Sequence, residues 1–319
     1  MRRFSIGTSI GDGFGLVASR PLSVFVWGLL LLAPTFGAFA LIFPALGEMI
    51  ANMPTEDAAG AGDGPFPEMF AEMMQFQLAS MLLNVGQLAM MAVVYTAIFR
   101  AVLRPTGRGL FSVRLGMDEL RVAVIGLAIG IGLYAAMIVL ALLGAAIAFA
   151  LWSGDPMVAG WAIAAYVLLV VLGLCWAMAR VSMMAPASVL YRDFAFVQGW
   201  RLASGKGWPL FGMMLLILVM ILVIEGILLL IGVVAFSGFG AASGLAWAAN
   251  PDANPFIGFE AWLAANWYWA VIGAAVVSFF YGVVLTLAVA PFASACRQLA
   301  DGDRPASTPD ETGSLAPPQ

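Results

Sequence analysis

Histidine is absent from this chain, and charged residues of both signs are scarce. The 319 residues include no histidine, two cysteines and only 10% charged residues. Without histidine there is no His-based general acid or base, no Ser-His or Cys-His nucleophile, and no His-ligated metal or haem. Cys175 and Cys296 lie in or beside apolar stretches, where cysteine packs as a small hydrophobe. The sequence therefore predicts a non-enzymatic protein with no metal and no cofactor.

Motifs that bind phosphate or build a nucleophile are also missing. The chain contains no Walker loop, no dinucleotide fingerprint between a strand and a helix, and no nucleophile elbow. The glycine-rich stretch 11–15 follows no strand and lacks the Lys-Ser/Thr of a phosphate loop. Nothing in the sequence supports binding to nucleic acid.

Apolar residues dominate what is present. They make up 63% of the chain, and the mean hydropathy is +0.99, whereas soluble domains are about half apolar and about a quarter charged. A helix that crosses the apolar layer of a bilayer needs about 20 mostly apolar residues. Six stretches satisfy this length, at about 22–47, 74–99, 122–151, 158–184, 209–236 and 263–290. We therefore expect an all-α, six-span bundle over residues 1–297 and a disordered, Pro-rich tail over 298–319.

Charge is distributed unequally between the two ends of these spans. All fourteen Lys and Arg residues precede the first span, follow the sixth, or lie at the second-to-third and fourth-to-fifth links. The other three connections contain acidic residues and no basic one. Because short cytoplasmic loops carry an excess of Lys and Arg, we predict an inner-membrane protein with both termini in the cytoplasm. We also read the first span as an uncleaved segment.

Short amphipathic segments precede the odd-numbered spans. Residues 13–16 (Gly-Phe-Gly-Leu) and 199–202 (Gly-Trp-Arg-Leu) align at a constant offset of 186 residues. The link 111–121 occupies the equivalent place before the third span. The sequence predicts a short cytoplasmic helix in the membrane interface at each of these places. An internal repeat and chance similarity both remain open as explanations of the alignment.

Glu225 lies near the middle of the fifth predicted span, with apolar neighbours on both sides. An ionisable side chain at this depth normally faces protein or a water-filled cavity. One interpretation is a protonated carboxyl that donates a hydrogen bond to a neighbouring span, with Asn84 and Gln87 as its partners. The alternative is a small secondary transporter in which Glu225 is the proton- or cation-coupling carboxylate.

The basic links are candidate contacts for anionic lipid headgroups. The residues concerned are Arg100, Arg104, Arg108, Arg114, Arg121, Arg192, Arg201 and Lys206. The alternative is that they only set the topology. The lipid bilayer is the one partner that the composition requires, and a protein that organises lipids or membrane partners is the function that we favour.

Small residues recur at helical spacing within two spans. Gly126 and Gly130 lie in the third, and Ala274, Ser278 and Gly282 lie in the sixth. Such spacing permits close approach of helices. Packing within the bundle and a homo-oligomer are both compatible with it.

The stretch 180–211 resembles a known membrane domain. A span leads through Pro186 and an aliphatic stretch to Trp200, Leu202, Gly205 and Trp208 at the entry to the next span. This order is similar to the membrane domain found beside some bacterial glycerophosphoryl diester phosphodiesterases, and in related standalone membrane proteins. The resemblance implies six spans with both ends inside. The phosphodiesterase activity belongs to a separate soluble domain with histidine, which this chain lacks, so that activity does not carry over.

Overall fold

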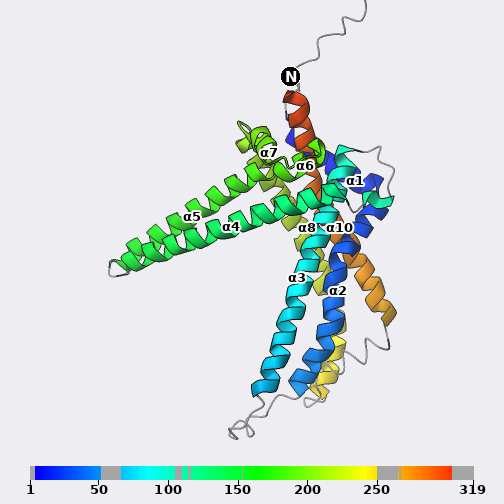
Figure 1. Ribbon diagram of the computed structural model, residues 1–319. Coiled ribbons are helices and arrows are strands. Elements are labelled where there is room, and N and C mark those ends of the chain that lie inside the picture. Colours follow the sequence, from blue (N-terminus) through cyan, green and yellow to red (C-terminus); the bar gives the residue numbers. More distant parts are fainter. Residues whose placement is uncertain are drawn as a thin grey trace, which may run out of the picture.

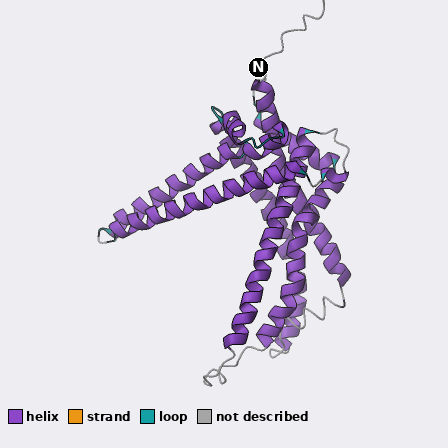
Figure 2. Ribbon diagram, viewed as in Figure 1, coloured by secondary structure: helices purple, strands orange, loops and turns teal. Residues whose placement is uncertain are grey.

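The computed structural model describes residues 4–51, 66–104, 110–113, 116–152, 154–249, 265 and 267–303. Helices account for almost all of this part (Figure 2). Their bounds are α1 (Ile6–Ser19), α2 (Pro21–Ala51), α3 (Phe66–Leu103), the 3₁₀ turn η2 (Leu110–Ser112), α4 (Met117–Ala150), α5 (Pro156–Val181), α6 (Met184–Tyr191), α7 (Phe196–Ala203), α8 (Gly207–Ala249) and α10 (Trp267–Asp303).

Six helices in the described part are long and apolar enough to cross a membrane. The stretches are Pro21–Ala38, Phe76–Leu103, Met117–Ala150, Pro156–Tyr191, Gly207–Val233 and Trp267–Gly302. The predicted all-helical, six-span fold is therefore confirmed, and the chain is a polytopic membrane protein.

The sixth span ends later than predicted. Helix α10 continues to Asp303, so residues 298–303, which the sequence assigned to a disordered tail, are helical. Gln298 explains part of this extension, because its Oε1 accepts a hydrogen bond of 3.0 Å from the backbone N–H of Ser5. Its Nε2 donates to Ser9 Oγ at 3.1 Å. The remainder of the predicted tail, 304–319, lies outside the described residues.

The helices diverge from one crowded end of the molecule (Figure 1). Helix α2 packs on α3 and α10, whereas α4 and α5 form a hairpin that projects sideways from the others. The short helices α1, α6 and α7 gather where these directions meet. Buried apolar side chains concentrate there as well, with Trp27, Ile98, Met183 and Leu287 almost fully buried. We call this the basic end, because Arg20, Arg100, Arg121, Arg180 and Arg297 lie at the helix ends that form it.

Glycines allow α2 and α10 to cross in backbone contact. A Cβ atom on Gly28 would lie 1.8 Å from the carbonyl oxygen of Ser278, and one on Gly282 would lie 2.1 Å from that of Val24. The small-residue series predicted in the sixth span thus packs within the bundle. A Cβ on Gly126 or Gly130 would meet nothing within 4 Å among the described residues, so these two glycines make no such close contact there.

The short helices before the first and fifth spans bury equivalent residues. In α1 the buried residues include Gly13 and Leu16, and in α7 they include Gly199 and Leu202, which are the positions that align at the offset of 186. The helix α1 packs on α10 and α7 packs on α6. A Cβ on Gly199 would lie 2.5 Å from Met184 Cα. In each helix the aligned glycine and leucine therefore face protein.

The link before the third span differs from its prediction. Instead of one helix over 111–121, the described part has the turn η2, and α4 begins at Met117. Phe111 and Ser112 have left-handed backbones, with φ of 58° and 57°, which interrupts any helix. The turn is fixed by Trp27, whose indole N–H donates to the Phe111 carbonyl at 2.9 Å, and by Arg100, which donates to the Ser112 carbonyl at 3.0 Å.

Candidate headgroup-binding surface at the basic end

An ion-pair network joins the end of α3 to the start of α4. Arg100 Nη2 lies 2.7 Å from Glu119 Oε1 and 3.6 Å from Asp118 Oδ2. Asp118 also pairs with Arg104 at 3.6 Å and with Arg121 at 3.0 Å. The Arg100 and Glu119 side chains are only 14% and 7% exposed. These three arginines are among the candidate headgroup contacts of the sequence, and each is paired within the protein.

Arg104 extends the network to α6, since its Nη2 donates to the carbonyl of Val189. Burial lowers the pKa of the Arg104 guanidinium below its ordinary value, and the nearby Arg192 lowers it further. Asp118 acts in the opposite direction. Arg192 therefore lies close enough to the Arg104 guanidinium for the two positive charges to repel each other.

A second ionic contact fixes α1 on α10. Arg297 Nη2 lies 3.1 Å from Asp12 Oδ2, and Ser294 Oγ donates to the same oxygen at 2.6 Å. Arg297 also donates to the carbonyl of Val102 at 3.1 Å. This contact was not foreseen from the sequence, because Asp12 and Arg297 lie at opposite ends of the chain.

The other described residues of the candidate headgroup set lie on the link from α5 to α8. Arg192, Arg201 and Lys206 are exposed, and none forms a hydrogen bond or ion pair through its side chain with a described residue. Arg108 and Arg114 lie outside the described residues. The predicted basic face thus divides into an inner group that is paired and an outer group that is free to meet a ligand.

Backbone geometry presents the outer group at sharp corners. Arg192 follows α6 with φ 56° and ψ 36°, a left-handed conformation that costs a non-glycine residue about 1 kcal/mol. Arg201 lies in the last turn of α7. Gly205, with φ +74°, then reverses the chain so that Lys206 precedes the first turn of α8. The glycine of the resembling motif is thus placed where an L-residue would be strained.

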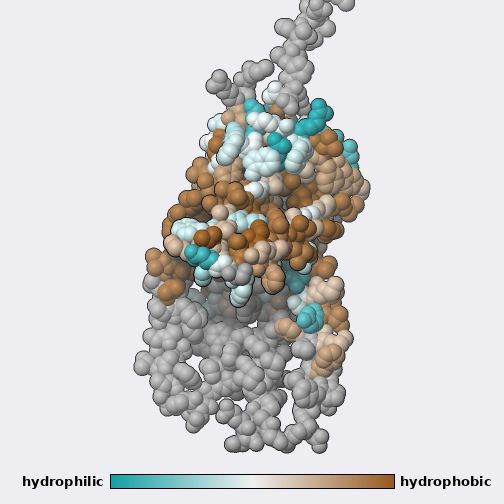
Figure 3. Space-filling view, turned by 90° about the vertical axis from the view of Figure 1, so that its left-hand side faces the viewer, coloured by the Kyte–Doolittle hydropathy of each residue, from teal (hydrophilic) through white to brown (hydrophobic). Residues whose placement is uncertain are grey.

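Aromatic side chains surround the outer group. Trp176, Tyr191, Phe194, Trp200 and Trp208 are all at least 41% exposed. Tryptophan and tyrosine favour the depth of lipid headgroups. Hydrophilic residues gather at this end of the molecule, above a broad apolar surface (Figure 3). The other motif residues, Pro186 and Leu202, are buried and hold α6 and α7 in place.

Arg180 completes the surface and was missed as a site residue. Its guanidinium carbon lies 4.6 Å from the ring centroid of Trp176 and 5.1 Å from that of Trp200. The first contact has a sequence signal, because side chains four residues apart lie on one face of a helix. The second depends on how α7 packs and has no signal in the sequence.

The intramembrane candidates do not come together. Glu225 is exposed on α8 and forms no hydrogen bond or ion pair with a described residue. Helix α8 packs on α5 and α10, whereas α3 packs on α2, α4 and α10. The expected partnership of Glu225 with Asn84 and Gln87 is therefore absent from the described part.

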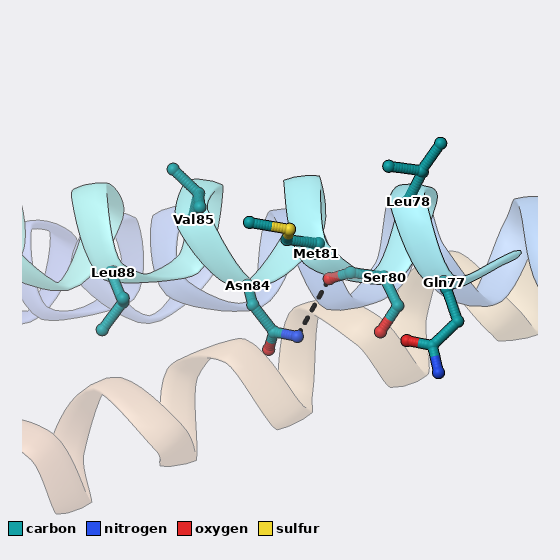
Figure 4. A pocket seen from close by; sticks show the side chains of 7 residues that line it. All are labelled: Gln77, Leu78, Ser80, Met81, Asn84, Val85 and Leu88. Atoms are coloured by element: carbon teal, nitrogen blue, oxygen red, sulfur yellow. Dashed lines mark hydrogen bonds between the residues drawn. The ribbon is translucent and has the colours of Figure 1, made fainter. Parts of the chain in front are cut away.

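Asn84 instead belongs to a polar stripe on α3. Its Nδ2 donates to the Ser80 carbonyl at 2.9 Å. Gln77, Ser80 and Asn84 line an open groove of about 370 Å³ together with four apolar residues (Figure 4). Gln87 continues the same helical spacing and is half-buried. Within the described residues, no group of three His, Cys, Asp or Glu side chains is placed to hold a metal ion.

Comparison of the chain with protein-family models, curated proteins and solved structures finds no match.

Proposed function

We propose that this polytopic membrane protein is non-enzymatic and binds anionic lipid headgroups through the outer basic group, thereby organising lipids or membrane partners. The observation that carries the proposal is that Arg192, Arg201 and Lys206 are exposed and unpaired within the described chain. Their aromatic surroundings suit the interface between water and lipid. Arg100, Arg104 and Arg121 serve a different purpose, since their charge is balanced internally.

The orientation follows from the same charges. We place the basic end on the cytoplasmic side of the inner membrane, because all fourteen Lys and Arg residues belong to that side of the spans. The cytoplasmic leaflet carries the anionic lipids that attract such residues. Reporter fusions at the C-terminus and in the link 153–155 test this orientation, and we expect only the first to report from the cytoplasm.

The size of the expected effect follows from the number of free charges. Each Lys or Arg near an anionic surface contributes about 1 kcal/mol. Arg192, Arg201 and Lys206 together should contribute about 3 kcal/mol, which corresponds to about a hundredfold in affinity. The paired arginines should contribute less because Asp118 and Glu119 offset their charge.

Bound-lipid mass spectrometry of the purified protein tests the proposal without presupposing a ligand. The protein is exchanged into micelles that contain equal amounts of one anionic and one zwitterionic phospholipid with the same acyl chains. We expect the anionic lipid to dominate the bound fraction, and the preference to weaken as ionic strength rises. Equal retention of the two lipids at low salt would refute it.

Glu225 supports a second candidate function, a small secondary transporter. Its carboxyl is unpaired among the described residues, whereas a purely structural carboxyl at this depth needs a hydrogen-bond partner. Glu225→Gln keeps the shape and removes the charge. Loss of a pH-driven flux in reconstituted vesicles, with the melting temperature unchanged, is the result expected of a transporter. An unchanged flux, or no flux in the unsubstituted protein, excludes this role.

A further inference from the structure

Arg180 is held between two tryptophans from different helices. Trp176 lies one turn earlier on α5, and Trp200 reaches Arg180 from α7. A guanidinium stacks on aromatic faces through its flat surface. Contacts at 4.6 Å and 5.1 Å with two rings therefore anchor the guanidinium beside both indoles.

The N–H donors of this guanidinium have no acceptor among the residues that the structure describes. Arg180 forms no hydrogen bond or ion pair with a described residue, and its buried Nε has no hydrogen-bond partner. A buried donor without a partner loses its hydration without compensation, and this cost is larger when the donor is charged. Every other arginine of the spans that is described, Arg100, Arg121 and Arg297, reaches a carboxylate. Arg180 is therefore a cation whose hydrogen-bond donors are available to an acceptor from outside the described chain.

The surroundings leave room for such an acceptor at the Nη groups. The Arg180 side chain is only half-buried, and its Nε is the nitrogen that is buried without a partner. A Cβ atom on Gly207 would lie 3.4 Å from Trp176 Nε1 and 3.9 Å from Arg180 Nε, so the start of α8 packs closely against the Nε side. Trp176 and Trp200 are each 41% exposed. Lys206, the residue before Gly207, is also exposed. Indole and guanidinium donors thus lie beside the start of α8, where the exposed Lys206 is the neighbouring residue in the chain.

We propose that Trp176, Arg180 and Trp200 form a clamp for the phosphate of a single anionic phospholipid. A fixed guanidinium can donate two parallel hydrogen bonds to phosphate oxygens, while the indole rings border the glycerol and the upper acyl chains. The location favours a lipid rather than a soluble phosphate, because Arg180 belongs to an apolar stretch long enough to span the membrane, Pro156–Tyr191. This inference rests on the proposed lipid binding and assigns one specific site within it.

The Arg180→Lys variant provides the sharpest test. It keeps the positive charge and a cation–π contact but loses the planar fork. Gln198→Ala is the matched control, since it removes an exposed polar side chain of α7 near Trp200 without changing the clamp or the outer basic group. The readout is the number of anionic lipids retained per protein in native mass spectrometry at high salt, with the melting temperature in detergent as a check of folding.

We expect the unsubstituted protein and Gln198→Ala to retain one salt-resistant anionic lipid, and Arg180→Lys to bind it at least tenfold more weakly. Equal retention by Arg180→Lys would overturn the clamp while leaving the broader lipid preference intact. If the unsubstituted protein shows no anionic preference at any salt concentration, the proposed function itself fails. Displacement of the lipid by millimolar inorganic phosphate would overturn the assignment to a lipid.

Discussion

Arg100 on α3 and Glu119 on α4 form a buried ion pair, with 2.7 Å between Nη2 and Oε1. The pair connects the second and third spans on either side of a link whose described part is the turn η2. Arg100 also donates to the Ser112 carbonyl within that turn at 3.0 Å. One arginine therefore fixes the link as well as the two helices. Its charge is therefore used within the protein and does not make a contact with lipid.

Removal of Arg100 should destabilise the protein strongly. Arg100→Gln leaves Glu119 as a buried carboxylate without its partner, and breaking such a pair costs about 3–5 kcal/mol. Arg201→Gln, at an exposed position, should cost less than about 0.5 kcal/mol. Thermal unfolding of the two variants in the same detergent measures the difference. Equal melting temperatures would show that the ion pair contributes little.

The crossing of α2 and α10 should tolerate no side chain at Gly28. Gly28→Ala places a Cβ 1.8 Å from the Ser278 carbonyl oxygen, so the two helices have to separate. We expect loss of the folded protein or a large drop in melting temperature. Gly126→Ala is the matched control, because its Cβ meets nothing within 4 Å. In a helix that change is favourable by about 1 kcal/mol, so a clear loss of stability in the control would contradict the packing described.

The corner before α8 depends on Gly205. Its φ of +74° favours glycine, and we expect Gly205→Ala to cost about 1 kcal/mol. Gly205→Asn should cost less, because asparagine adopts left-handed conformations more readily. Chemical or thermal unfolding in detergent should therefore rank glycine, asparagine and alanine in that order of stability. Alanine as stable as glycine would be inconsistent with this geometry.

The hairpin of α4 and α5 should lie alongside α3 in a bilayer. Spans that cross one apolar layer tilt by about 0–40° from its normal, whereas the hairpin projects sideways (Figure 1). Spin labels at Met81 and Leu142, which are 65% and 66% exposed, measure the distance between α3 and the hairpin. Cys175 and Cys296 are first replaced so that only these two positions are labelled. Adjacent helices lie about 8–10 Å apart, so we expect a separation of about 10–20 Å in lipid. A separation of several tens of ångström would exclude this alignment.

The helices were predictable because hydropathy and length dictate them, and the structure confirms each of the six spans. The ion pair between Asp118 and Arg121, three residues apart, was predictable in the same way because helical spacing alone brings the residues together. The pairing of Arg100 with Glu119 was not, since it depends on how the link folds between two spans. From the sequence alone, all the arginines of the basic end are equivalent candidates for headgroup contact. The structure divides them into arginines that are paired with carboxylates and arginines that are exposed without such a partner among the described residues.

Glu225 and Arg180 illustrate two further limits. Glu225 was assigned partners by similar depth in the membrane, but depth does not determine which helices are neighbours, and α8 packs on α5 and α10 instead of α3. In the sequence, nothing distinguishes Arg180 from the other basic residues at the ends of spans. Only the packing of α7 brings the Trp200 ring to within 5.1 Å of its guanidinium carbon. Tertiary contacts of this kind leave no periodic signal in a single sequence.

The exposed basic residues between α6 and α8 are proposed to contact anionic headgroups, and one comparison of variants tests this contact most directly. The R192Q/R201Q/K206Q variant removes this charge, while Asp193→Asn removes a neighbouring exposed negative charge. In mixed anionic and zwitterionic vesicles of equal composition, the anionic preference of the reconstituted protein should fall about a hundredfold in the triple variant and rise slightly in Asp193→Asn. An unchanged preference in the triple variant, with folding intact, would contradict headgroup binding by these three residues.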